Sequence, residues 1–178
     1  KNIGVVFGQR SQLWWDVPVI DSFELLKDIY GISDGVYKKN LSDLTELLNL
    51  QEILKTPVRQ LSLGQRMRCE VSAALLHDPK VLFLDEPTTY LDINIRFEIM
   101  DLIRSLNQQG KTIIMVLHDL NLALEYSDHI VLMNSGQIVN QGSPQQIIHS
   151  GDIDRIFDIT THVFYENEKQ FYHFAKHN

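Results

Sequence analysis

The chain has 178 residues, and its 16 Lys and Arg against 23 Asp and Glu give a net charge of −7. With 44% hydrophobic and 22% charged residues, the composition is that of a globular protein and excludes collagenous, coiled-coil and disordered chains. The acidic balance argues against a domain that binds nucleic-acid phosphates, and no apolar run approaches the roughly 20 residues that cross a bilayer. The single cysteine, Cys69, allows no internal disulfide and is expected to be a small buried helix residue.

The first element predicted is a strand at residues 3–7, because this segment is apolar and rich in β-branched side chains. Gly8 and Gln9 end it, and a loop carrying Trp14 and Trp15 follows. The strand begins at once and the first residue is not Met, so we expect no signal peptide and a chain cut out of something longer.

Apolar residues at spacings of three and four predict amphipathic helices between residues 22 and 76, with breaks at residues 31–35 and 55–57. The positions expected on buried helix faces include Phe23, Leu25, Leu26, Ile29, Leu41, Leu44, Leu47, Leu48, Leu50, Met67, Val71, Ala74 and Leu75. We interpret residues 20–76 as a helical insert.

Beyond Pro79 the pattern alternates between strand and helix. Strands are predicted at residues 80–84, 112–117, 130–133 and 138–141, and helices at 95–106, 120–126 and from the Ser143 capping box, with a closing hairpin or helix after Asp152. Continuous apolar strands alternating with helices indicate an α/β fold with a parallel sheet covered on both faces. We expect three parts, at residues 1–19, 20–76 and 77–178.

Two carboxylates follow one of these strands, at Asp85 and Glu86. Open α/β sheets bind ligands at the carboxyl ends of their strands. Neighbouring strand residues point to opposite faces, so both acids reach one site only if the backbone turns, which Pro87 favours. The pattern suits one acid for a metal and one for a water, although a solvated strand end is an equally common explanation.

Two further places carry candidate chemistry. Ser62 and Gly64 stand at the start of a predicted helix, where unpaired backbone N–H groups and the absence of a side chain on Gly64 suit an anion. Simple N-capping by Ser62 is the commoner use of a serine at a helix start. His118 directly follows the strand at residues 112–117 and is expected at the same sheet edge as Asp85 if the two strands are parallel neighbours. The other six histidines show no ligand-like spacing.

Together these residues resemble the ATP-binding subunits of ABC transporters over nearly the whole chain. Residues 61–65 (LSLGQ) are similar to the family signature, and residues 81–86 (VLFLDE) to its Walker B motif with the catalytic glutamate. The Q-loop, D-loop and switch-histidine motifs are matched at residues 7–9, 90–92 and 116–119. The five motifs stand in the family's order.

The phosphate-binding loop of the family, G-x-x-x-x-G-K-[ST], is absent from the sequence. The resemblance therefore implies a P-loop NTPase-like parallel sheet core whose N-terminal part is missing, with a helical signature subdomain. Without the loop's backbone donors and lysine, we expect this chain alone to bind ATP poorly and to hydrolyse it negligibly.

The resemblance also implies roles for single residues in the intact parent, where two subunits enclose ATP and Mg²⁺ and each lends its signature to the other's nucleotide. Glu86 would polarise the attacking water, Asp85 would hold Mg²⁺ through water, and His118 would contact the γ-phosphate. Gln9 would sense both Mg²⁺ and water. Nucleotide contacts across the dimer are implied for Ser62, Leu63, Gly64, Gln65 and Asp92.

The partners implied are a second ATP-binding subunit, in a homodimer or pseudo-dimer, and transmembrane permease subunits. The location implied is peripheral, at the cytoplasmic face of the plasma (inner) membrane, without nucleic acid. Two alternatives stay open: a soluble ABC ATPase without a transport role, and a non-catalytic truncated cassette that acts as an interaction module.

The two halves of the chain resemble different subfamilies. Residues 6–16 are similar to exporter-type subunits, whereas residues 88–93, 118–121 and 128–130 are similar to iron–siderophore or cobalamin importers. The two tryptophans of the loop suit either a groove for a permease's coupling helix or packing within the helical insert.

Overall fold

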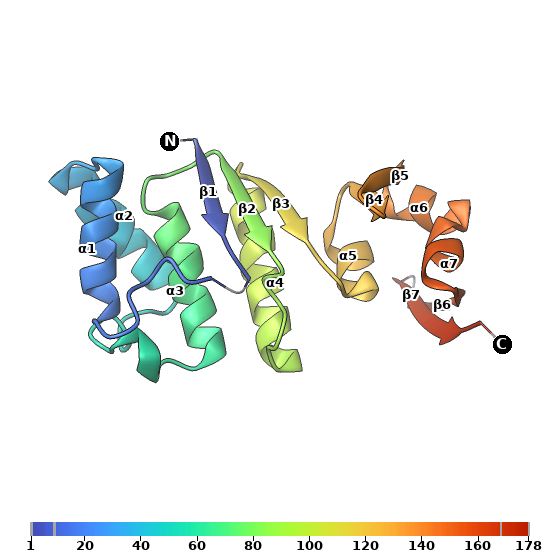
Figure 1. Ribbon diagram of the computed structural model, residues 1–178, viewed down its shortest axis with the longest axis horizontal. Helices are drawn as coiled ribbons and strands as arrows, with labels where there is room; N and C mark the ends of the chain where they lie inside the picture. The colour runs from blue at the N-terminus through green and yellow to red at the C-terminus, as the bar shows by residue number, and fades with distance from the viewer. Residues whose placement is uncertain (1, 9, 168, 178) are drawn as a thin grey trace. The chain divides into compact units, whose positions relative to one another are not determined.

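The computed structural model describes residues 2–8, 10–167 and 169–177 (Figure 1). It divides into two compact units, residues 1–117 and residues 118–178. Among the described residues, no helix combines the length and the apolar character needed to cross a membrane.

A three-stranded parallel sheet forms the centre of the first unit, in the order β1-β2-β3 (Figure 1). Its strands are β1 (Ile3–Val6), β2 (Val81–Asp85) and β3 (Thr112–Val116). Val6 pairs with Leu84, and Leu84 pairs with Met115. All three lie where the sequence predicts strands, so the parallel sheet is confirmed.

Two helices, α3 (Leu63–Leu75) and α4 (Ile93–Gln108), contact the sheet and each other. Gly4 on β1 allows α3 to come close, since a Cβ built at Gly4 would lie 2.4 Å from the carbonyl oxygen of Ala74. Leu82 and Leu84 on β2 are fully buried. The middle of this unit's core is therefore the contact between α3 and one face of the sheet.

The opposite face of the sheet carries exposed apolar side chains. Ile3 is 58% exposed, Ile114 48% and Val116 39%. These residues alternate with the ones beneath the helices, because successive strand residues point to opposite faces. Among the described residues, α3 packs on the Gly4 face and these exposed side chains lie on the other, so cover on both faces stays a prediction for the intact protein.

The remaining helices of the first unit are α1 (Val19–Tyr30), α2 (Asp34–Leu47) and the short 3₁₀ helix η1 (Val58–Gln60). Gly31 ends α1 with a φ of 63°, a conformation that glycine adopts without steric cost. Val19, Phe23 and Leu26 form the buried stripe of α1.

Two positions of α1 that the sequence predicts to be buried are exposed. Leu25 is 43% exposed and Ile29 is 62% exposed. At about 100° per residue, both fall beside the stripe defined by Val19, Phe23 and Leu26 and not on it. Their assignment to the core is wrong.

The second unit contains α5 (Leu120–Tyr126), β4 (Ile130–Asn134), β5 (Gln137–Gly142), α6 (Pro144–Ser150), α7 (Asp152–Phe157), β6 (Ile159–Glu166) and β7 (Lys169–Lys176). β4 pairs with β5 and β6 with β7, both antiparallel. The last stretch is thus a hairpin preceded by the short helix α7. Leu124, Leu132, Ile147 and Ile153 form the core of this unit.

Helix α6 begins as the sequence predicts. The Ser143 side chain accepts a hydrogen bond from the backbone N–H of Gln146, and the Gln146 side chain accepts one from the backbone N–H of Ser143. Pro144 occupies the first turn. This capping box confirms the predicted helix start.

Candidate functional site

The structure brings Asp85 and Glu86 to one hollow at the carboxyl end of β2, the central strand of the sheet. The hollow has a volume of about 230 Å³, and Phe7, Gly8 and Arg10 complete its lining. Both acids are partly exposed. Two acidic residues and Arg10 thus line one open edge of the sheet, where a polar ligand has access.

A turn at Glu86 brings this residue to the same hollow as Asp85. Glu86 has a φ of 50°, in the left-handed region that a residue with a Cβ rarely adopts. Its backbone N–H donates to the carbonyl of Val116 at 3.1 Å, and its carbonyl accepts from the N–H of Thr89 at 3.2 Å. The backbone therefore turns at Glu86 itself, directly before Pro87, as a shared site for both acids requires.

Thr89 also orients the Glu86 carboxylate, since its hydroxyl donates to Oε2 of Glu86 at 3.2 Å. The motif reasoning did not single out Thr89, although a hydroxyl residue three positions after a turn acid is a signal for this kind of contact. One carboxylate oxygen of Glu86 is thus held by its own turn. Such fixing suits a group that must orient a water.

The loop after β1 reaches the same hollow through Gly8 and Arg10. A Cβ built at Gly8 would lie 2.7 Å from the carbonyl oxygen of Asp85, so a side chain at this position would push the loop away from β2. Gln9, the residue predicted to sense metal and water, lies outside the described residues. Arg10 is a second residue that motif reasoning missed, and its place directly after Gln9 was the available signal.

The fit of a divalent cation rests on the donor set at the strand end. Carboxylate oxygens are the ligands that Mg²⁺ prefers, and Mg²⁺ commonly binds one or two carboxylates together with substrate phosphates. The described part of the chain has no group of three or more His, Cys, Asp or Glu able to enclose a metal by itself. Asp85 and Glu86 therefore fit Mg²⁺ that arrives with a phosphate ligand and do not form a closed protein cage.

The predicted anion site at the start of α3 forms a capping box. The Ser62 hydroxyl accepts from the backbone N–H of Gln65 at 3.2 Å, and Oε1 of Gln65 accepts from the N–H of Ser62 at 3.0 Å. Ser62 and Leu63 are exposed. The N-capping alternative for Ser62 is thus present in the structure, and it leaves the first turn of α3 open to a ligand from outside.

Gly64 has a packing role within this unit. It is buried, and a Cβ built on it would lie 2.7 Å from Cγ2 of Ile95 on α4. Ile95 is β-branched and stiff at χ1, so it cannot swing aside at low cost. The glycine therefore lets α3 approach α4, independently of any anion.

Replacing Ser62 by alanine separates capping from ligand binding. We expect the loss of the cap to lower the free energy of unfolding by about 1 kcal/mol, measured by urea titration. Ser143 supplies a matched control, since it caps α6 with the same pair of hydrogen bonds. Ser143→Ala is expected to cost about as much stability. In the intact parent that the family resemblance implies, Ser143→Ala is expected to leave ATP turnover unchanged and Ser62→Ala to lower it; equal turnover in the two variants would remove Ser62 from the ligand site.

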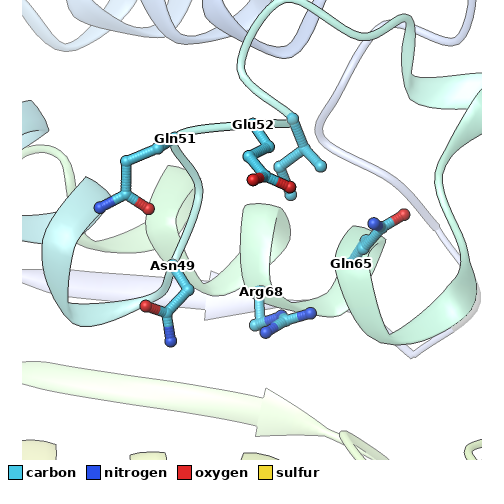
Figure 2. Close-up of a pocket in the computed structure, with 6 residues that line it drawn as sticks. Asn49, Gln51, Glu52, Gln65 and Arg68 are labelled. Carbon is cyan, nitrogen blue, oxygen red and sulfur yellow. The ribbon is translucent and has the colours of Figure 1, made fainter.

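A second cavity, of about 470 Å³, lies beside α3 (Figure 2). Gln65 and Arg68 reach it from α3, and Asn49, Gln51 and Glu52 reach it from the segment after α2. Its lining is mostly polar, with one carboxylate and one guanidinium. Such a lining suits hydroxyl or amide groups better than an apolar ligand.

The predicted D-loop leads into α4. Tyr90 has a φ of 64° and is 77% exposed. Asp92 is exposed and precedes the first residue of α4, where its carbonyl accepts from the N–H of Arg96 at 2.9 Å. Nε of Arg96 donates to the carbonyl of Leu91 at 2.7 Å. Asp92 is thus accessible to a partner molecule, as its predicted role requires.

His118 is the first residue of the second unit, two positions after the end of β3. Its neighbour Asp119 caps α5 by accepting from the backbone N–H groups of Asn121 at 3.0 Å and Leu122 at 3.2 Å. This cap fixes the direction in which the chain leaves His118. The role of His118 at a phosphate stays a prediction.

Comparison with known proteins assigns the chain to a family. Residues 1–89 match the family described as ABC transporter. The energy-coupling factor transporter ATP-binding protein EcfA3 of Oenococcus oeni is 36% identical over 149 residues, which cover 83% of this chain and 51% of that protein. The petrobactin import ATP-binding protein FpuC of Bacillus anthracis is 40% identical over 116 residues, covering 65% and 43%. The chain thus spans about half or less of these relatives.

Solved structures support the same assignment. The cbiO1 protein of Clostridium perfringens, part of the ABC transporter complex cbiONQ, superposes with a TM-score of 0.73 at 28% identity, covering 86% of this chain and 62% of that one. A putative metal-chelate type ABC transporter in an inward-facing conformation reaches a TM-score of 0.84 at 23% identity, covering 98% and 72%, which shows the fold alone. The chain therefore belongs to the ABC transporter family and has the fold of its ATP-binding cassettes.

Proposed function

We propose that this chain is the catalytic-side portion of an ATP-hydrolysing ABC transporter subunit that powers transport through partner permeases. The observation that carries the proposal is the hollow at the end of β2, where Asp85 and Glu86 lie together with the Gly8 end of the loop. Phosphoryl transfer requires mainly positioning and charge neutralisation, and a strand-end acid pair supplies a metal ligand and a water-orienting base.

The two carboxylates have different roles in this proposal. Asp85 would hold Mg²⁺, whose positive charge would neutralise the phosphates. Glu86, held by Thr89, accepts a hydrogen bond from the attacking water and so orients it toward the γ-phosphate. As the family resemblance implies, Gln9 would contact metal and water, and His118 would contact the γ-phosphate.

The signature residues act on the nucleotide of a second subunit. Ser62 and the backbone N–H of Gly64 meet its γ-phosphate, Leu63 and Gln65 complete that surface, and Asp92 connects the two subunits. The exposure of Ser62, Leu63 and Asp92 supports this arrangement. The subunit pair binds to the permease at the cytoplasmic face of the membrane.

The names of the relatives suggest the class of cargo. FpuC is named for petrobactin import, and a second relative, the achromobactin transport ATP-binding protein CbrD of Dickeya dadantii, is 45% identical over 108 residues. These relatives support the importer resemblance of the second half of the chain. An iron–siderophore, as that resemblance implies, is therefore the cargo to test first.

The role of the phosphate-binding loop is tested by calorimetric titration of MgATP. We expect this chain to give no saturable binding below about 1 mM, because it contains no G-x-x-x-x-G-K-[ST] sequence to cradle the triphosphate. The intact subunit, meaning the full-length protein that joins this chain to such a loop, is expected to bind MgATP and to release phosphate. Tight binding of MgATP by the chain alone would show that the phosphate-binding loop is not needed for binding.

A further inference from the structure

Glu70, in the middle of α3, is a buried carboxylate that the proposed mechanism does not use. Its side chain is only 3% exposed. Burial raises the pKa of the Glu70 carboxyl, while hydrogen bonds from Ser11 and Gln12 and the charge of Arg66 act in the opposite direction. A carboxylate in such a place is stabilised only by well-placed partners. Its partners therefore indicate what it is for.

Both hydrogen-bond partners come from one short loop far away in the sequence. The Ser11 hydroxyl and the backbone N–H of Gln12 donate to the two oxygens of Glu70, the latter at 3.1 Å. Ser11 in turn accepts from the N–H of Leu13 at 3.0 Å, and the Gln12 side chain donates to the carbonyl of Val5 on β1. Glu70 thus fixes the middle of a loop that is already folded upon itself.

The same loop reaches the candidate site at one end and the helical region at the other. Gly8 packs against the carbonyl of Asp85. At the other end, the N–H of Trp14 donates to the hydroxyl of Ser22 on α1 at 3.1 Å. The guanidinium of Arg66, one turn before Glu70 on α3, lies 5.7 Å from the centre of the Trp15 ring. Helix α3 therefore holds the loop at two points.

We infer that Glu70 is a positioning residue: its carboxylate joins residues 11–12 to α3 and thereby sets where the Gly8 end of the loop lies against Asp85. The inference rests on the proposed function for its effect on turnover. It assigns no contact between Glu70 and the nucleotide. The contact of Glu70 with residues 11–12 couples the loop after β1 to α3. A displacement of α3 would therefore also move the loop against Asp85.

The test compares two substitutions in the intact subunit. Glu70→Leu removes both acceptors and introduces an apolar side chain of similar size, so the free energy of unfolding is expected to fall as Ser11 and Gln12 lose their partner. Glu70→Gln keeps an oxygen that accepts from the N–H of Gln12, and its amide N–H can donate to the hydroxyl oxygen of Ser11, whose own hydrogen then goes to the carbonyl of Leu13. Glu46→Leu is the matched control, because Glu46 is an exposed glutamate on α2.

Two measurements are made on each variant: hydrogen exchange at the amides of residues 10–15, and kcat and KM for MgATP hydrolysis. In Glu70→Leu we expect exchange at Gln12 to become at least about tenfold faster, because a hydrogen bond to a charged group is lost. We also expect kcat to fall at unchanged KM. Glu70→Gln restores both values, and Glu46→Leu changes neither.

Several results would overturn the inference. Unchanged exchange in Glu70→Leu shows that the loop does not depend on Glu70, and a released loop with unchanged kcat shows that its position does not matter for turnover. Should Glu70→Leu fail to fold, Ser11→Ala removes one contact from the loop side without altering α3, and the same two readouts decide. Hydrogen exchange needs no ATPase activity, so an inactive wild-type subunit would refute the proposed function and leave the exchange result interpretable.

Discussion

Replacing Glu86 by glutamine in the intact subunit is expected to lower ATP hydrolysis by about 10²- to 10⁴-fold while leaving ATP binding in place. Glutamine has the size of glutamate and keeps an oxygen for the hydroxyl of Thr89, so the turn at the end of β2 should persist. The amide is, however, too weak a base to orient and polarise a water. The measurement is phosphate release at saturating MgATP, together with the dissociation constant of the nucleotide.

The control for this substitution is Glu98→Gln. Glu98 is an exposed glutamate on α4, so its neutralisation changes net charge by the same amount as Glu86→Gln. We expect it to retain wild-type turnover. Turnover of Glu86→Gln equal to that of the control would remove Glu86 from the catalytic role and leave Asp85 as the remaining acid of the hollow.

Replacing Gly4 by alanine is expected to produce the largest loss of stability among the glycine substitutions considered. The added methyl group would lie 2.4 Å from the carbonyl oxygen of Ala74 and 3.0 Å from Cγ of Pro79. The first of these atoms belongs to the backbone of α3, which cannot rotate away. We expect the free energy of unfolding to fall by about 1–3 kcal/mol, measured by urea titration of the chain.

Gly35 provides the opposite case for comparison. It lies in the first turn of α2, and a Cβ built there meets nothing within 4 Å. Since alanine loses less conformational freedom than glycine in a helix, Gly35→Ala is expected to stabilise the chain by about 0.5–1 kcal/mol. A Gly4→Ala variant as stable as Gly35→Ala would mean that α3 does not pack as closely on β1 as described.

The hydrophobic pattern predicted the elements of the fold well because each strand is a short continuous apolar run bounded by turn residues. β2 is the clearest case, since its buried residues Leu82 and Leu84 are followed at once by Asp85 and Glu86. Motif spacing also predicted the acid pair at the strand end. These are local properties, and a sequence displays local properties directly.

Contacts between distant segments could not be predicted in this way. The carboxylate of Glu70 accepts hydrogen bonds from Ser11 and Gln12, which lie 59 and 58 positions earlier in the chain. No local sequence pattern relates these residues to Glu70. Gly64 is a similar case, because a Cβ at this position would clash with Ile95 on α4, a residue about 30 positions later in the chain. Periodicity also predicts an amphipathic helix without saying how wide its buried stripe is, which is why Leu25 and Ile29 were assigned wrongly.

The face of the sheet that carries Ile3, Ile114 and Val116 has a practical consequence for anyone who purifies this chain. Every 100 Å² of apolar surface withdrawn from water contributes roughly 2.5 kcal/mol, so such a face favours self-association as the concentration rises. Salts that are excluded from protein surfaces, such as sulfate, strengthen this tendency. Low protein concentration and a mild non-ionic detergent are therefore the conditions under which the chain should be handled.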